Sequence, residues 1–146
     1  MLPDIACACA TVRRLSRLLT QLYDDHLRPS GVEAPQMVLL GTLAALPGIS
    51  QAALGTRLAL DKTTLSRNLR LMEANGWIEP APVKDRRQKG FRLTSLGQDR
   101  LAAAKPLWAA AQARFQSSMN QKEWQEMFTV LRRVTNSAQS AAGGTI

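Results

Sequence analysis

The side chains most able to do chemistry in this sequence are cations gathered near its middle. Residues 57–92 hold nine Lys or Arg side chains against four Asp or Glu, whereas residues 1–56 hold four of each kind. The whole chain of 146 residues has a formal net charge of +8, so most of the charge lies in about a quarter of its length. Such a cluster attracts anionic partners, and an ordinary solvated face is the alternative interpretation.

The inventory for catalysis is poor. His26 is the single histidine, and Cys7 and Cys9 are the two cysteines. One imidazole allows a thiol–imidazole or Ser–His–Asp arrangement in only one way, and no glycine loop of the GxxxxGK or GxGxxG kind occurs. Two cysteines make neither a disulfide framework nor a four-ligand metal set. The sequence therefore predicts a protein that is not an enzyme, with no metal and no cofactor.

Length and composition predict one soluble domain. Hydrophobic residues make up 45% and charged residues 21%, which is typical of globular proteins. No apolar run approaches the ~18 residues needed to span a bilayer, and residues 1–12 lack the basic start of a secretory signal. We expect a cytoplasmic protein with no membrane partner.

The central cations fall on a predicted helix-turn-helix. Ser50 is a good N-cap for a helix over 51–58, and Asp61 is one for a helix over 62–74. The second helix has an apolar stripe at helical spacing and is ended by Gly76. The stripe consists of Leu65, Leu69 and Met72.

A hairpin is predicted directly after these helices. Residues 77–80 and 90–94 have the pattern of short strands, and the loop over 81–89 between them is dense in charge. A helix-turn-helix followed by a two-stranded hairpin with a basic tip is a winged helix.

Helical periodicity also predicts elements on either side. A continuous apolar stripe indicates a helix over 5–27, and a more fully apolar helix follows Pro35. Near the other end, Asn120 and Glu123 form a capping-box pattern before a last amphipathic stripe that ends near Ala138. A four-element winged helix cannot cover both end stripes, so they need each other or a partner chain.

A long Ala-rich helix is expected between the hairpin and the last helix. Ser95 and Gln98 resemble a capping box, which would open this helix and carry it to about Ser118. Pro106 lies inside it, and a proline there removes one helical hydrogen bond. We expect either a kink near residues 102–106 or a break into two helices.

The helix over 62–74 presents polar side chains away from its apolar stripe. An α-helix fits the major groove of B-DNA, where hydroxyls near its N-terminus can meet phosphates or base edges and arginines can pair with guanine. The candidate DNA contacts of this recognition helix are Lys62, Thr63, Thr64, Ser66, Arg67 and Arg70.

Three stretches carry a family resemblance. They are LYD at 22–24 with PSG at 29–31, LMEANGWI at 71–78, and DRR at 85–87 followed by LTSLG at 93–97. With the order of elements, they make residues 5–140 resemble the MarR family of bacterial transcription regulators. The resemblance implies a mainly α fold with a small β-hairpin: a winged helix-turn-helix DNA-binding lobe at 35–94, and dimerisation helices at 5–34 and 95–140. All of 1–146 is then one MarR-like domain that forms a homodimer.

The resemblance also assigns the hairpin loop. In the family, the arginine matching Arg87 enters the minor groove of double-stranded DNA and the aspartate matching Asp85 holds it. A planar guanidinium suits a narrow, negatively charged groove. Lys84, Arg86 and Lys89 are expected to neutralise phosphates, which adds affinity without sequence information.

Two kinds of switch are consistent with the sequence. Cys7 and Cys9, on opposite sides of a helix, are candidates for oxidation, since Arg13 and Arg14 lie about a turn further on. Simple burial in a dimer interface is the alternative. Family members also respond to small aromatic or anionic ligands, and the residues that could line such a pocket are Arg17, Tyr23, His26 and Trp108.

Together these patterns predict a sequence-specific transcriptional regulator, a repressor that binds a pseudo-palindromic operator as a homodimer and is released by a ligand or by thiol oxidation. We expect it at the nucleoid when bound. The alternative is an architectural DNA-binding protein that tolerates any sequence, because a basic winged helix need not read bases.

Overall fold

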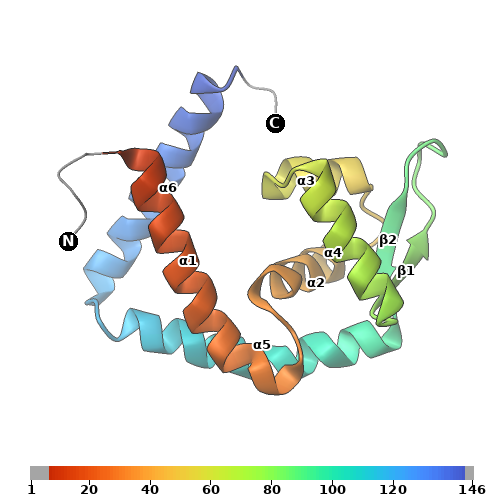
Figure 1. Ribbon diagram of the computed structural model, residues 1–146, viewed down its shortest axis with the longest axis horizontal. Helices are drawn as coiled ribbons and strands as arrows, with labels where there is room; N and C mark the ends of the chain where they lie inside the picture. Colours follow the sequence, from red (N-terminus) through yellow and green to blue (C-terminus); the bar gives the residue numbers. More distant parts are fainter. Residues whose placement is uncertain (1–6, 144–146) are drawn as a thin grey trace.

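A computed structural model describes residues 7–143, and it is mainly α-helical with one small hairpin, as the sequence predicts (Figure 1). Residues 5 and 6 of the first predicted helix lie outside the described residues. The elements are α1 (Ala8–Leu27), the 3-10 helix η1 (Arg28–Ser30), α2 (Ala34–Ala45), α3 (Gln51–Leu58), α4 (Lys62–Ala74), β1 (Ile78–Ala81), β2 (Gly90–Leu93), α5 (Ser95–Gln116) and α6 (Gln121–Ala141).

The helix-turn-helix forms where its capping residues predict. Ser50 Oγ accepts the Ala53 amide at 3.1 Å to start α3, and Asp61 Oδ1 accepts the Thr64 amide at 2.8 Å to start α4. Between the helices, Ala59 takes a left-handed conformation with φ of 51°, which costs a residue with a Cβ roughly 1–3 kcal/mol. The turn that sets the two helices against each other is therefore slightly strained.

The hairpin is joined to the helix-turn-helix through its backbone. β1 and β2 pair antiparallel, with Ile78 opposite Leu93, and β2 continues into a bridge between Gly90 and Ser50. The Gln51 amide donates to the carbonyl of Lys89 at 2.7 Å. The start of α3 is thus fixed to the base of the hairpin loop. We call the hairpin, residues 78–93, the wing.

The start of α5 differs by one residue from the expectation. Thr94, not Ser95, is the N-cap: its Oγ1 accepts the Gly97 amide at 3.0 Å and donates to the carbonyl of Gly76 at 2.5 Å. A Cβ at Gly97 would collide with the Trp77 carbonyl, so only glycine lets α5 pack this closely against the residue that precedes the wing. The predicted break at Pro106 is wrong, because α5 is one helix from Ser95 to Gln116.

The buried core lies mostly between α2, α4, the wing and the first half of α5. It contains Leu39, Leu40, Leu43, Leu54, Leu65, Leu69, Met72, Ile78, Leu101 and Ala104, with Leu27 from the end of α1. Figure 1 shows α5 running along the base of the molecule, with α2, α3, α4 and the wing at one end and α1 and α6 rising from the other. We call α2 to β2 the winged lobe, and α1, α6 and the second half of α5 the stalk.

The stalk helices bury little of their apolar stripes within one chain. Leu27 is the only buried residue of α1, and no residue of α6 is buried, although the structure describes both helices completely. Large side chains are exposed along both: Val12, Leu15, Leu18, Phe128, Val130, Leu131 and Val134. None of the helices within residues 7–143 is long and apolar enough to cross a membrane.

Candidate nucleic-acid interface

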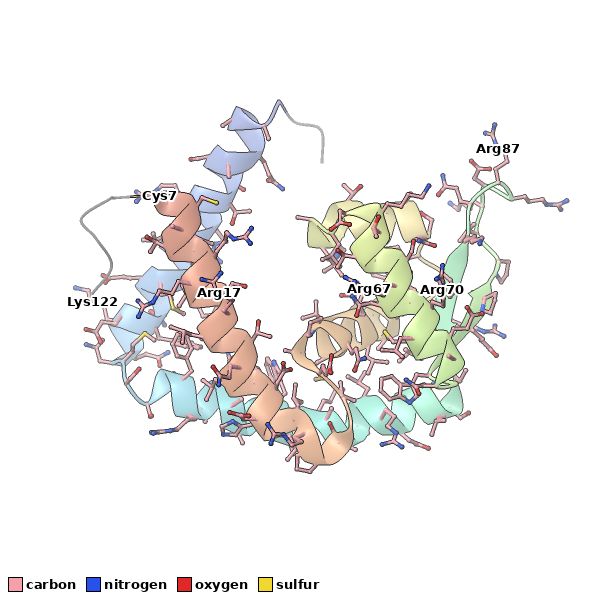
Figure 2. The ribbon with its side chains drawn as sticks, in the orientation of Figure 1. Cys7, Arg17, Arg67, Arg70, Arg87 and Lys122 are labelled. Atoms are coloured by element: carbon pink, nitrogen blue, oxygen red, sulfur yellow. The ribbon has the colours of Figure 1, made fainter. Side chains whose placement is uncertain are left out.

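The outer face of α4 carries four of the candidate DNA contacts in exposed positions. Lys62, Thr63, Arg67 and Arg70 are exposed, while Leu65, Leu69 and Met72 fix the opposite face in the core. Figure 2 shows Arg67 and Arg70 on α4 in the same part of the molecule as the wing. This face presents cations and hydroxyls together on one rigid helix.

Thr64, another candidate DNA contact, takes part in the N-terminal cap of α4. Its hydroxyl donates to Asp61 Oδ2 at 2.6 Å, and the same carboxylate accepts the Thr64 amide. These bonds, the hydroxyl first, lower the pKa of Asp61 below its usual range. The cap is therefore charged at neutral pH, and the Thr64 oxygen keeps only its acceptor capacity for an outside partner.

Ser66 is half-buried and accepts a hydrogen bond from Gln51 Nε2 at 2.8 Å. The sequence reasoning missed Gln51, because nothing in its position at the start of α3 indicates a contact fifteen residues away. Through its side chain it holds the recognition helix, and through its amide it holds the wing.

A cavity of about 600 Å³ opens where α3, α4 and the wing meet. Lys62 comes to it from α4 and Lys89 from the wing, with Gln51, Ser66 and Gln88 as polar neighbours. The fold therefore gathers cations that are far apart in the sequence around one hollow, and such a hollow suits an anionic group.

Arg87 is held by Asp85 while remaining in solvent. The Arg87 amide and Nε both donate to Asp85 Oδ1, at 3.0 and 3.2 Å, yet 91% of the arginine side chain is exposed. The backbone amide of Arg87, and then its guanidinium, lower the pKa of Asp85. Since the folded-state pKa is depressed, the contact persists at neutral pH and is lost only as the pH falls through that lowered value. Figure 2 shows Arg87 at the wing tip, directed away from the body.

The other wing cations differ in how far they are neutralised. Lys84, Arg86 and Lys89 are exposed, whereas Arg92 donates through Nε to Glu79 at 2.7 Å. Glu79 and Arg92 face each other in the strand register, so this pair arises from the hairpin itself. The tip of the wing is therefore more strongly cationic than its base.

Figure 2 shows Cys7 at the start of α1, far from the wing. Cys7 is not on the helix as expected: it is the extended residue that precedes α1, whereas Cys9 lies in the first turn. Both are free thiols, with Cys7 half-buried and Cys9 exposed. Cys7 and Cys9 are therefore not two positions of one helix, and helical spacing does not set the directions of their side chains.

Only two of the four ligand-pocket candidates share a cavity in the described chain. Tyr23 and Trp108 line a space of about 280 Å³ between α1, α2 and α5, and burial raises the pKa of Tyr23. Arg17 borders another hollow, which is lined by residues of α1 and η1, and His26 Nδ1 lies 2.9 Å from the carbonyl of Leu22.

A larger apolar cavity of about 650 Å³ lies beside the space that Tyr23 and Trp108 line. Both cavities are bordered by Met37, Val38 and Trp108. Arg57 and Lys105 border it and bring two cations to an otherwise apolar space. The sequence reasoning missed both, since Arg57 lies on α3 and Lys105 on α5 and no spacing rule relates them.

Comparisons with known proteins agree with this arrangement. Residues 30–88 match the sequence profile of the MarR family. The transcriptional regulator HosA of Escherichia coli O157:H7 is 31% identical over 121 residues, which cover 79% of this chain and 89% of HosA. The uncharacterized HTH-type transcriptional regulator YwoH of Bacillus subtilis is 25% identical over 83 residues, which cover 57% of this chain but only 61% of YwoH.

One solved structure is similar along nearly the whole chain. The transcriptional regulator MosR of M. tuberculosis, solved in complex with DNA, is 34% identical and superposes with a TM-score of 0.80. The match covers 96% of this chain and 99% of MosR.

Proposed function

The chain belongs to the MarR family and is a transcriptional regulator of that type, and from this premise we propose that it represses genes by binding a specific pseudo-palindromic operator as a homodimer. The observation that carries the proposal is the exposed Arg87 whose direction is set by Asp85. A guanidinium held outward in solvent is ready to enter a narrow minor groove without first being ordered.

The recognition helix α4 supplies the major-groove contacts in this proposal. Arg67 and Arg70 are the side chains on α4 able to pair bidentately with guanine in the major groove, while Lys62 and Thr63 at its start meet phosphate. Lys84, Arg86 and Lys89 add phosphate contacts from the wing. The MosR relative supports double-stranded DNA as the partner, because it was solved in complex with DNA.

Dimerisation is proposed from the exposed stripes of the stalk. Leu15 and Leu18 on α1 and Phe128 and Leu131 on α6 would be covered by the same helices of a second copy. The division of labour is then residues 35–94 for DNA and residues 5–34 and 95–140 for the dimer. Two lobes related by a two-fold axis would read half-sites about one helical turn, roughly 34–36 Å, apart.

Release from DNA is proposed to follow a small aromatic or anionic ligand, or thiol oxidation. The paired cavities around Trp108 support the ligand, since Tyr23 offers a polar aromatic wall and Arg57 and Lys105 offer cations. The exposure of Cys9 supports access of an oxidant. No cofactor or metal enters this account, and the protein is expected to act in the cytoplasm, at the nucleoid.

Selection of bound genomic fragments tests the proposal. We expect enrichment of inverted half-sites whose centres lie about 10 base pairs apart, in front of genes that are induced when the protein is deleted. Competition with excess unrelated duplex should give a specificity ratio above about 10³. A lower ratio with no enriched sequence would favour the architectural binder instead.

Oxidation is tested on the same fragments. Peroxide, reversed by a dithiol, should release wild-type protein but not the variant with both Cys7→Ser and Cys9→Ser. Equal release of the two proteins would exclude these thiols, and the ligand would then be the remaining route.

A further inference from the structure

α5 extends from the winged lobe into the stalk, and it contains a position at which a helix is weakened, Pro106. Leu101 and Ala104 lie in the core of the lobe, whereas Ala111 is buried further along, after Pro106. Pro106 has no amide hydrogen to give to the carbonyl of Ala102, so the helix lacks one of its ladder bonds there. A helix bends most easily at such a position.

α1 and η1 lie alongside α5 and cross this weak point. Beyond Pro106, the Tyr23 hydroxyl of α1 donates to Gln112 of α5. Before Pro106, Arg100 Nη1 of α5 donates to the carbonyl of Ser30 in η1 at 2.9 Å. α1 and η1 are therefore hydrogen-bonded to α5 on both sides of Pro106.

Arg100 also reaches the base of the wing. Its guanidinium carbon lies 6.0 Å from the centre of the buried Trp77 ring, which is within the range of a cation–π contact. Arg100 is half-buried, and no carboxylate of residues 7–143 forms an ion pair with it. Its two partners are thus the carbonyl of Ser30 in η1 and the aromatic ring of Trp77 next to β1.

We propose that Arg100 is a positioning residue that sets the angle between the stalk and the winged lobe. It does so by holding α1 and η1 against α5 on both sides of Pro106. The inference rests on the proposed function, since that angle matters only if two lobes must meet two half-sites at a fixed separation. Arg100 itself touches no DNA in this account.

A series of operator duplexes tests it, with the spacer between half-sites changed by −1, 0, +1 and +2 base pairs. Wild-type protein should lose about 10-fold or more in affinity at each altered spacing. Arg100→Met, which keeps the stem but loses the donor, should bind the native spacing about 10-fold more weakly and discriminate between spacings by no more than about 3-fold.

Three further measurements separate positioning from general damage. A duplex with a single half-site should be bound equally by wild type and Arg100→Met. Arg114→Met, which removes an exposed arginine from the same helix, should leave the spacing preference intact. Arg100→Lys, which keeps a cation and a donor, should retain most of the discrimination.

Restoring the missing helical bond gives the sharpest check. If α5 bends at Pro106, Pro106→Ala should return spacing discrimination to the Arg100→Met protein. The inference is overturned if Arg100→Met discriminates as wild type does, or if Pro106→Ala fails to rescue it. A wild-type protein that shows no spacing preference would instead overturn the proposed two-site reading, and this inference with it.

Discussion

The winged lobe and the stalk use their apolar residues in opposite ways. In the lobe, leucines from α2, α3 and α4 are buried against the wing and α5 within one chain. In the stalk, α6 is fully described and has no buried residue, although it carries an apolar stripe as regular as any in the lobe. The lobe buries its apolar side chains within one chain, whereas the stalk leaves its stripes exposed, and these are the surfaces that the second copy of the proposed dimer would cover.

This difference separates two kinds of specificity. The lobe is tied together by backbone bonds from the wing to α3 and by caps on both helices, so the relative position of α4 and Arg87 is a property of one chain. In the proposed dimer, the separation of two such lobes would depend on the contact between the two copies and on α5, the helix that joins lobe to stalk. Substitutions in the two regions should therefore fail in different ways.

The largest effect is expected from Leu131→Asp in the stalk. A carboxylate in an apolar dimer interface loses its hydration without a partner, which costs several kcal/mol and should weaken association at least about 10³-fold. Analytical ultracentrifugation should find monomers that bind the operator poorly. Leu96→Asp is the matched control, since Leu96 is similarly exposed, 45% against 39%, but lies near the wing. A dimeric Leu131→Asp protein would contradict the assignment of the interface.

Two leucine-to-alanine substitutions, one in the lobe and one in the stalk, should differ in how they change the free energy of unfolding. Leu54→Ala in the lobe removes a side chain with no exposed surface and should lower the free energy of unfolding by about 3 kcal/mol at any protein concentration. Leu18→Ala in the stalk removes one that is 53% exposed in the single chain, so its cost should appear only through dimerisation. Denaturant titrations at two protein concentrations distinguish them, and equal behaviour would break the distinction between the regions.

Within the lobe, the wing cations should differ in their role: Arg87 should contribute to sequence specificity, and Lys84 to affinity for any DNA. Arg87→Ala should weaken operator binding about 10- to 100-fold with little change on unrelated DNA. Lys84→Ala should weaken binding to all sequences and reduce the salt slope by about one. Fluorescence anisotropy across a salt series measures both. An Arg87→Ala protein with full operator affinity would remove the main support for the wing assignment.

The smallest effect concerns the turn between α3 and α4. Ala59→Gly should raise the free energy of unfolding by about 1 kcal/mol, because glycine adopts the left-handed conformation without a Cβ clash. Gly76→Ala, at φ of 72°, should lower it by a similar amount, about 1 kcal/mol. Thermal unfolding checks both, and a loss of stability in Ala59→Gly would mean that the turn is not strained.

Local patterns were enough to predict the elements of the lobe. Ser50 and Asp61 cap helices where their type and position indicate, and Leu65, Leu69 and Met72 are buried as their spacing requires. The error at Thr94 has a simple cause, since Thr94 and Ser95 are both good capping residues and only the contact with Gly76 decides between them. Pro106 stays within one helix because α1 and η1 pack along α5 on both sides of it, which no local rule reveals.

The contacts that position the candidate site could not be predicted in the same way. Gln51 meets Ser66 only because α3 crosses α4, and Arg100 meets Ser30 across 70 residues. The ligand candidates show the same limit: Tyr23 and Trp108 share a cavity, whereas Arg17 and His26 lie elsewhere in the described chain, and Arg57 and Lys105 enter from other helices. Residue type and helical spacing identify what can bind, but only the tertiary packing decides which side chains meet.

The most direct test of the account is the mass of the complex formed on the selected operator, measured by sedimentation at concentrations near the dissociation constant. We expect two chains on each duplex and no stable complex with one chain. A single chain bound at full affinity, or a number of chains that grows with duplex length, would contradict a dimer that reads two half-sites.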